Sequence, residues 1–138
     1  MMKKRGCLFY LHVMMLLISA VLGLLSVILG AYIAHGVLGA SQKLMHNLTT
    51  ALNYHQLYAM MSFLILLYSI SLKQRSCLLL FASACFIVGI VLFSFGIYGA
   101  NLWHIDSALH FTPIGGSLFM LGWLILCLYI VRLLKIKP

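Results

Sequence analysis

Six histidines and one acidic residue are the side chains of this 138-residue sequence best suited to metal binding or acid–base chemistry. Imidazole nitrogens bind zinc, copper or iron, and three of them with one carboxylate complete a four-ligand site. The candidate ligands, which we expect on one side of the molecule, are His35, His55, His104, Asp106 and His110. Their spacing counts against a metal site, because the tight patterns H-x-x-x-H and H-E-x-x-H do not occur. The sequence therefore predicts no cofactor, and the simpler interpretation is that these histidines bond to loop carbonyls and lipid headgroups.

Two other kinds of chemistry would use the same residues. An imidazole with an ordinary pKa of about 6.5 changes charge in mild acid, so these histidines, with His46, are candidate pH sensors. A Ser–His–Asp triad can be named from Ser107, His104 and Asp106, but neighbouring loop residues seldom converge in that way, and Asp106-Ser107 is more typical of a turn. Acid–base catalysis needs positioned groups, and the sequence has a single acidic side chain, so we expect no enzymatic activity.

The elements that position these residues must lie in a membrane. Of all residues, 64% are hydrophobic and only 7% are charged, which leaves too few polar side chains to cover a water-soluble fold. A helix needs about 20 apolar residues to cross a bilayer. Four such stretches cover residues 8–34, 54–72, 77–100 and 113–134. We predict an all-α integral membrane protein, with one domain over residues 1–138 in which four transmembrane helices form an up-down-up-down bundle.

The basic residues mark the ends of these stretches. Eight of the nine fall on one side of a four-span arrangement: Lys3, Lys4, Arg5, Lys73, Arg75, Arg132, Lys135 and Lys137. Lys43 and Asp106 fall on the other side, in the outer segments 35–53 and 101–112. The positive-inside rule therefore predicts that both termini are cytoplasmic. Because basic residues in these places anchor to lipid headgroups, the expected partner is the bilayer and not a nucleic acid.

The outer segments also carry two signals of local structure. Leu44, Leu48 and Leu52 recur every four residues among polar side chains, which predicts an amphipathic interfacial helix that runs into the second span. Thr112-Pro113 predicts the start of the last helix, with Thr112 as the capping residue and Pro113 in the first turn.

Small residues recur seven apart within the predicted spans, which places them along one stripe of each helix. Helices in lipid are held together by close backbone approach, since burial from lipid gains little. We therefore interpret the following as inward packing residues: Gly23, Gly30, Ala82, Gly89, Gly96, Gly115 and Gly122. The alternative is that glycine is simply frequent in membrane helices.

A longer pattern runs through most of the chain. It consists of Gly30-Ala31-Tyr32-Ile33-Ala34-His35, Thr50-Ala51-Leu52-Asn53-Tyr54, Leu92-Phe93-Ser94, Thr112-Pro113-Ile114-Gly115-Gly116 and Gly122-Trp123. In this pattern the sequence resembles the small membrane family called domain of unknown function 423, related to the animal transmembrane protein 256. The resemblance implies a multi-pass protein of the bacterial inner membrane and no known activity.

Three positions depart from the family pattern. Ile33 and Phe95 stand where the family more often has glycine, and Tyr58 stands where it often has histidine. If that histidine has a chemical role in the family, this chain lacks it or uses His55.

Function is predicted mainly by elimination. Ion-coupled transporters normally place ionisable groups near the middle of the membrane, and we expect none there, since His12 lies only a few residues into the first span. We expect a non-enzymatic membrane protein that acts through other membrane proteins, a second copy of itself, or lipids. The alternative is a carrier or channel for a small solute or metal ion that uses the outer histidines, and a membrane enzyme comes last.

Overall fold

The computed structural model describes residues 2–37, 39, 41–71 and 76–135, with side chains described from residue 8 onward. This part of the chain is helical, without strands. Its elements are α1 (Met2–Gly36), α2 (Gln42–Ser71), α3 (Cys77–Leu102), the 3-10 helix η1 (Asp106–Phe111) and α4 (Thr112–Lys135). Each predicted span lies within one of the four long helices, apart from residue 72, which is outside the described part.

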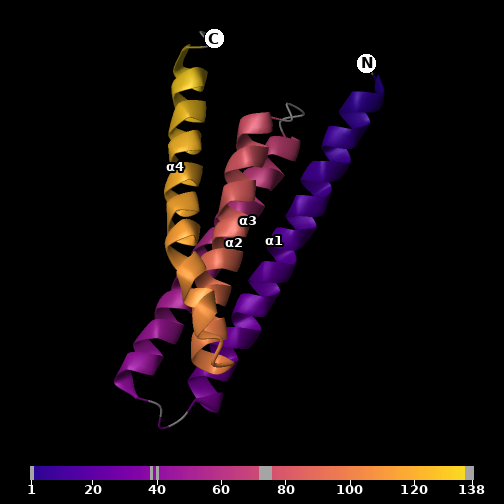
Figure 1. The fold of residues 1–138 in the computed structure, drawn as a ribbon. Helices are drawn as coiled ribbons and strands as arrows, with labels where there is room; N and C mark the ends of the chain where they lie inside the picture. The colour runs from indigo at the N-terminus through magenta and orange to yellow at the C-terminus, as the bar shows by residue number, and fades with distance from the viewer. Residues whose placement is uncertain (1, 38, 40, 72–75, 136–138) are drawn as a thin grey trace.

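The four long helices alternate in direction, so that α1 begins and α4 ends at the same end of the molecule (Figure 1). We call the opposite end, where α1 ends and α2 begins, the distal end. Helix α1 packs mainly on α2, α2 on α3, and α3 on α4, while α1 touches α3 at only a few positions. Half of the most apolar stretch of α3 is buried, against 17% for α1 and 22% for α4. The core therefore lies around α2 and α3, and α1 is attached from one side.

Three segments of the described chain are long and apolar enough to cross a membrane, namely Leu8–Gly36, Cys77–Leu102 and Asp106–Lys135. The predicted second span, residues 54–72, is not among them. Polar residues such as His55 and Gln56 lower the hydropathy of its first turns. Leu72, Lys73 and Arg75, on which the end of that span and its predicted cytoplasmic turn rest, lie outside the described residues.

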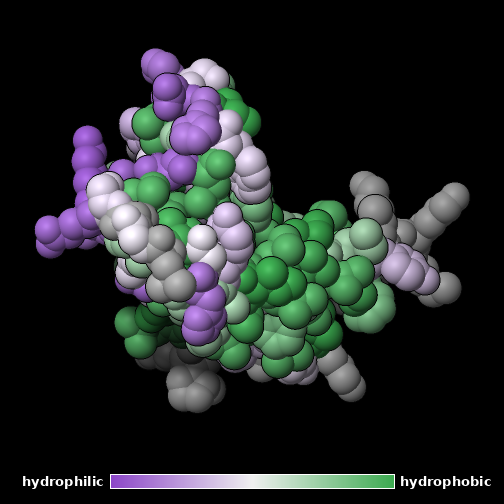
Figure 2. All heavy atoms as spheres, turned by 90° about the horizontal axis from the view of Figure 1, so that it is seen from below, coloured by the Kyte–Doolittle hydropathy of each residue, from purple (hydrophilic) through white to green (hydrophobic). Residues whose placement is uncertain are grey.

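Large apolar side chains point away from the bundle along the outer helices. Leu24, Val27 and Met120, for example, are 61%, 66% and 69% exposed. Seen from below in Figure 2, hydrophilic side chains gather over the distal end, whereas hydrophobic ones cover the neighbouring flank. Such a flank is stable in lipid and would be costly in water.

Helix α2 is continuous from Gln42 to Ser71, so the amphipathic segment and the second apolar stretch form a single helix. Ser41 caps its start, since its hydroxyl accepts a hydrogen bond from the Leu44 N–H at 3.3 Å. Of the predicted apolar stripe, Leu48 is fully buried, and Leu44 and Leu52 are half-buried against the same cluster.

Helices α3 and α4 meet through glycines that face phenylalanines. Phe119 of α4 lies over Gly89 of α3, and Phe86 of α3 lies over Gly122 of α4. One turn beyond the Gly89–Phe119 pair, a Cβ added at Gly115 would come within 2.6 Å of the Phe93 backbone nitrogen. Only glycine permits this approach.

The other small residues differ in their surroundings. Gly96 faces the Ala108 carbonyl and the Thr112 hydroxyl, and Ala82 is buried with Cys85 and Ile125. Gly30 faces Leu52 of α2 at ordinary distance, whereas a Cβ at Gly23 would meet nothing within 4 Å.

Thr112 is not the cap that the sequence predicted. Its φ and ψ of −58° and −43° are helical, and its N–H donates to the Leu109 carbonyl, so η1 continues directly into α4. A capping residue instead needs extended dihedrals to turn its side chain back on the helix. The Thr112 hydroxyl is consequently buried without a hydrogen bond to any described residue.

Candidate functional site

The five predicted ligand residues do not share one site. His35, His104, Asp106 and His110 are exposed at the distal end, whereas His55 is buried in the bundle. Within residues 2–135, apart from the gaps named above, no group of three or more His, Cys, Asp or Glu side chains is placed to hold a metal ion. The metal hypothesis therefore has no such group to rest on in the described chain, whereas the pH-sensor hypothesis stays a prediction.

His104 turns the chain after α3. Its φ of 56° is in the left-handed region, and the Ile105 N–H just beyond it donates to the Gly99 carbonyl at 3.0 Å. His110 donates from Nδ1 to the Ser107 carbonyl at 3.1 Å. Across the described chain, no hydrogen bond joins Ser107, His104 and Asp106, so these residues form a turn and not a triad.

Replacing His104 with glycine tests this structural role. Glycine adopts a φ of 56° without steric cost, whereas a side chain costs about 1 kcal/mol there. We expect His104→Gly to raise the free energy of unfolding by about that amount, and His104→Ala to bring no gain. Unfolding in detergent, followed by tryptophan fluorescence, measures both variants. A loss of stability in His104→Gly would mean that the imidazole itself makes a stabilising contact.

His55 is deeper than the sequence predicted. It was placed at the start of the second span, but α2 begins at Gln42, which puts His55 about 20 Å along the helix. The side chain is fully buried, and its ring lies 5.3 Å from that of Phe95 and 6.1 Å from that of Tyr98. The Leu22 backbone of α1 is close by, yet neither ring nitrogen makes a hydrogen bond of good geometry to a described residue. His55 is therefore an ionisable side chain buried inside the bundle, which the sequence did not predict.

His12, by contrast, is buried and fully paired. Its Nδ1 lies 2.8 Å from the Leu8 carbonyl, which only accepts, so Nδ1 carries a proton and donates it. Nε2 then accepts from the Ser69 hydroxyl at 3.1 Å, and Ser69 Oγ in turn accepts from the Ser76 N–H at 3.3 Å. This chain of hydrogen bonds joins α1, α2 and the start of α3.

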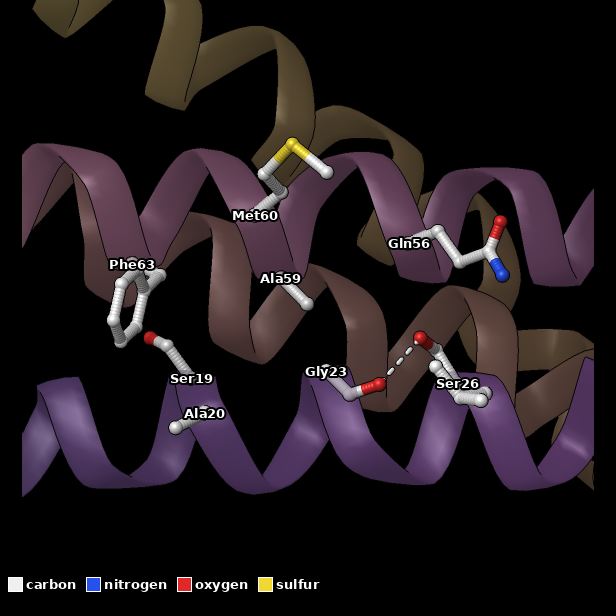
Figure 3. A pocket seen from close by; sticks show the side chains of 9 residues that line it. Ser19, Ala20, Gly23, Ser26, Gln56, Ala59, Met60 and Phe63 are labelled. Carbon is white, nitrogen blue, oxygen red and sulfur yellow. Dashed lines mark hydrogen bonds between the residues drawn. The ribbon is translucent and has the colours of Figure 1, made fainter.

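A groove of about 320 Å³ runs between α1 and α2. Its walls are Ser19, Ala20, Gly23, Ser26 and Val27 of α1, and Gln56, Ala59, Met60 and Phe63 of α2 (Figure 3). The Ser19 and Ser26 hydroxyls donate to the Met15 and Gly23 carbonyls of their own helix, which leaves the α1 wall nearly apolar. The Gln56 amide is exposed and makes no hydrogen bond to the described residues.

A second pocket, of about 260 Å³, lies at the distal end between α2, α3 and the η1–α4 junction. It is lined by His46, Asn47, Thr50, Ile97, Asn101, Leu109 and Thr112. Sequence reasoning did not find it. The only signal was the polar face of the segment before the second span, and that face was interpreted as lying in the interface.

The residues of the family pattern lie mostly where helices meet. Tyr54 stacks near Phe93 and Phe119, at 4.8 and 5.8 Å between ring centroids. The Trp123 indole N–H donates to the Tyr58 hydroxyl at 3.2 Å, across from α4 to α2. Ser94 is buried, whereas Ala34, His35 and Pro113 are exposed. Gly116 is not tightly packed either, since a Cβ added there would come no closer than 3.9 Å to Phe93 Cδ2.

The three departures from the pattern are all used in packing. The ring of Tyr58 stacks on Phe119 at 3.8 Å, Phe95 packs against His55, and Ile33 is 4% exposed in the cluster around Leu48. His55, the suggested substitute for the missing histidine, lies one turn before Tyr58 on the same helix.

Comparison with known proteins gives the family. The family described as "Protein of unknown function (DUF423)" matches residues 29–116. The chain belongs to this family. Among its relatives, the UPF0382 inner membrane protein YgdD of Escherichia coli K12 is 31% identical over 123 residues, which cover 86% of this chain and 90% of the relative. The UPF0382 membrane protein YwdK of Bacillus subtilis 168 is 29% identical, over 86% of this chain and 97% of the relative. No solved structure matches.

The relatives of this DUF423 protein and its apolar helices both indicate a location in the membrane. Relatives named as inner membrane proteins, together with three helices able to span a bilayer, identify a multi-pass membrane protein. The matched residues run from the last turns of α1 to the first turns of α4, so they contain both His55 and the whole distal pocket.

Proposed function

We propose that this protein is a non-enzymatic membrane protein that acts by binding a further transmembrane helix, from another membrane protein or from a second copy of itself, in the groove between α1 and α2. The observation that supports this is Gln56, an exposed amide without a partner in the described chain beside a wall of small residues. Small residues let a helix approach closely, and an amide in lipid gains about 1–2 kcal/mol from a hydrogen bond across helices.

We also propose that all four long helices cross the membrane, with both termini in the cytoplasm. Helix α2 has 30 residues, about 45 Å, which exceeds a hydrocarbon core of about 30 Å. It packs between α1 and α3, which are both candidate spans, and runs antiparallel to each. An impermeant reagent added outside intact cells should not label a cysteine introduced at Arg75. Labelling there would overturn the arrangement.

Photocrosslinking from two exposed methionines tests the helix-binding role. A photoreactive residue at Met60, 63% exposed in the groove wall, should give crosslinks to protein, which Gln56→Leu should reduce. The same residue at Met120, 69% exposed on α4, is the matched control and should give crosslinks to lipid alone. Lipid adducts alone from both positions would exclude a helix in the groove.

No catalytic role is proposed, because the only acidic side chain, Asp106, is exposed and has no described hydrogen-bond partner.

A carrier is the second candidate, and His55 is the observation in its favour. Ionisable side chains buried among transmembrane helices are expensive and usually serve a substrate or ion path. Purified protein in liposomes should then conduct a small ion or solute, and His55→Leu should abolish the flux. The outer histidines, which are exposed and apart, have no part in this candidate.

His55→Leu also has an expected effect on stability. An unpartnered buried polar group costs about 1–3 kcal/mol, and leucine would pack against Phe95 and Tyr98 without that cost. We expect the variant to be more stable by about 1–2 kcal/mol, measured by chemical unfolding in micelles. A less stable variant would mean that the imidazole is paired in the membrane, with the Leu22 backbone, a water or a solute as its partner.

A further inference from the structure

Helices α1 and α2 carry the same polar pattern, a histidine followed by serines seven and fourteen residues later. Its members are His12, Ser19 and Ser26 in α1, and His55, Ser62 and Ser69 in α2. All six side chains are buried, with at most 3% of each exposed. A spacing of seven residues keeps each set on one stripe of its helix. The two helices therefore present matching polar stripes inside the bundle.

The contact between His12 and Ser69 fixes the register of the two stripes. His12 Nε2 lies 3.1 Å from Ser69 Oγ, near the end of the molecule where α1 begins. Because the helices are antiparallel, fourteen residues forward along α1 correspond to fourteen residues back along α2, which places Ser26 level with His55. The Leu22 backbone, one turn before Ser26, lies beside His55, and this agrees with the register.

The two ends of the matching stripes differ in their hydrogen bonds. The pair of His12 and Ser69 is bonded. At the other end, His55 has no hydrogen bond of good geometry to a described residue, and the Ser26 hydroxyl donates to the Gly23 carbonyl of its own helix at 2.7 Å. The groove between α1 and α2 includes Ser26 in its wall, so it lies at this unbonded end. The open groove and the unpaired imidazole therefore occur together.

An approach of α1 to α2 at this end would bring Ser26 and His55 together. The Ser26 hydroxyl points from α1 towards α2 (Figure 3). A hydroxyl both donates and accepts hydrogen bonds, so it can pair with either nitrogen of a neutral imidazole. The groove leaves room for the approach, since a Cβ at Gly23 would meet nothing within 4 Å. Helix α3 hinders it little, because α1 touches α3 at only a few positions.

We propose that His55 and Ser26 form a latch that closes the groove. In a second conformation α1 moves onto α2 and the two side chains bond, as His12 and Ser69 do in the structure described here. The latch regulates the groove and in that respect rests on the proposed function, because a closed groove has no room for a further helix. The helix binds the open conformation alone, so the latch and the helix compete for the same two walls.

Disulfide trapping measures how often the groove closes. Cysteines are introduced at Gly23 and Met60, on opposite walls, in a variant whose native cysteines are replaced by alanine. The protein is oxidised with one copy in each lipid nanodisc. A disulfide joins Cβ atoms about 3.8 Å apart, whereas in the open groove no atom of α2 lies within 4 Å of a Cβ at position 23. Formation of the disulfide therefore reports the closed conformation.

We expect the disulfide to form, and Ser26→Ala to slow its formation about two- to tenfold, as the loss of one hydrogen bond predicts. His55→Leu should slow it to a similar extent. The double variant should be no slower than either single one, because both changes remove the same bond.

Ser71→Ala is the matched control, since this hydroxyl of α2 also bonds to a carbonyl of its own helix but is exposed outside the groove. It should leave the rate unchanged. Absence of the disulfide in the protein with the two introduced cysteines alone, or equal rates for Ser26→Ala and Ser71→Ala, would overturn the latch.

Photocrosslinking from Met60 separates this result from the proposed function. Crosslinks to protein, together with a disulfide that Ser26→Ala does not slow, contradict the latch and leave the bound helix in place. A disulfide that depends on Ser26 and His55, without crosslinks to protein, supports the latch and contradicts the bound helix.

Discussion

Gly115→Ala is expected to lower the free energy of unfolding by about 3 kcal/mol or more and to separate α4 from α3. The added Cβ would lie 2.6 Å from the backbone nitrogen of Phe93 and 3.0 Å from the Gly89 carbonyl. Both atoms belong to the α3 backbone, so no side chain can rotate to make room, and overpacking of this kind is among the costlier single changes. In lipid, no gain in apolar burial offsets the lost contact.

The neighbouring glycine provides the control for this experiment. A Cβ at Gly116 would meet nothing closer than Phe93 Cδ2 at 3.9 Å, so Gly116→Ala should be neutral or stabilise by up to about 1 kcal/mol through helix propensity. Both variants add one methyl group to the same helix, and they therefore share any change in helix propensity. Unfolding in mixed micelles of mild detergent and sodium dodecyl sulfate compares them. Equal stability of the two variants would show that α3 and α4 do not meet at these glycines.

Ser69→Ala is expected to cost about 2–3 kcal/mol. The hydroxyl is the donor to His12 Nε2 and the acceptor for the Ser76 N–H, so alanine leaves two polar groups without their partners at a buried position. Because the hydrogen bond between His12 and Ser69 joins α1 to α2, we also expect α1 of the Ser69→Ala variant to become accessible to protease before the rest of the bundle during unfolding. Protease sensitivity of α1, measured in parallel with global unfolding, reports this order.

Ser62 provides the control for the Ser69→Ala substitution. It is also fully buried on α2, seven residues before Ser69, but its hydroxyl has no partner among the described side chains and backbone groups. Ser62→Ala should therefore be neutral or slightly stabilising. If both alanine variants lose the same stability, the bond between Ser69 and His12 contributes nothing specific.

The sequence predicts the long helices well because each contains an apolar run. The third stretch, predicted over residues 77–100, is the helix Cys77–Leu102, and the fourth, predicted from residue 113, begins at Thr112. The prediction that Thr112 caps the fourth helix was wrong, because whether a threonine acts as a cap depends on the conformation of the residues before it. Here η1 leads into α4 with helical dihedrals, and no local pattern around Thr112-Pro113 signals that.

The candidate site was harder to predict for a different physical reason. Burial of His55 depends on where α2 begins and on which of its faces meets α1 and α3, and neither is encoded near residue 55. The distal pocket likewise combines His46 and Asn47 with Asn101 and Thr112, more than fifty residues further along the chain. Spacing along one helix cannot reveal such a combination.

The paired rings and glycines between α3 and α4 also determine how the molecule deforms. Sliding one of these helices by a turn, or rotating it, would drive Phe86 and Phe119 away from Gly122 and Gly89 and into residues that have side chains. Helices α3 and α4 are therefore fixed in register, with α2 fastened to them by Tyr58. Helix α1 contacts mainly α2 and borders an open groove, so it is the long helix whose position the rest of the bundle constrains least.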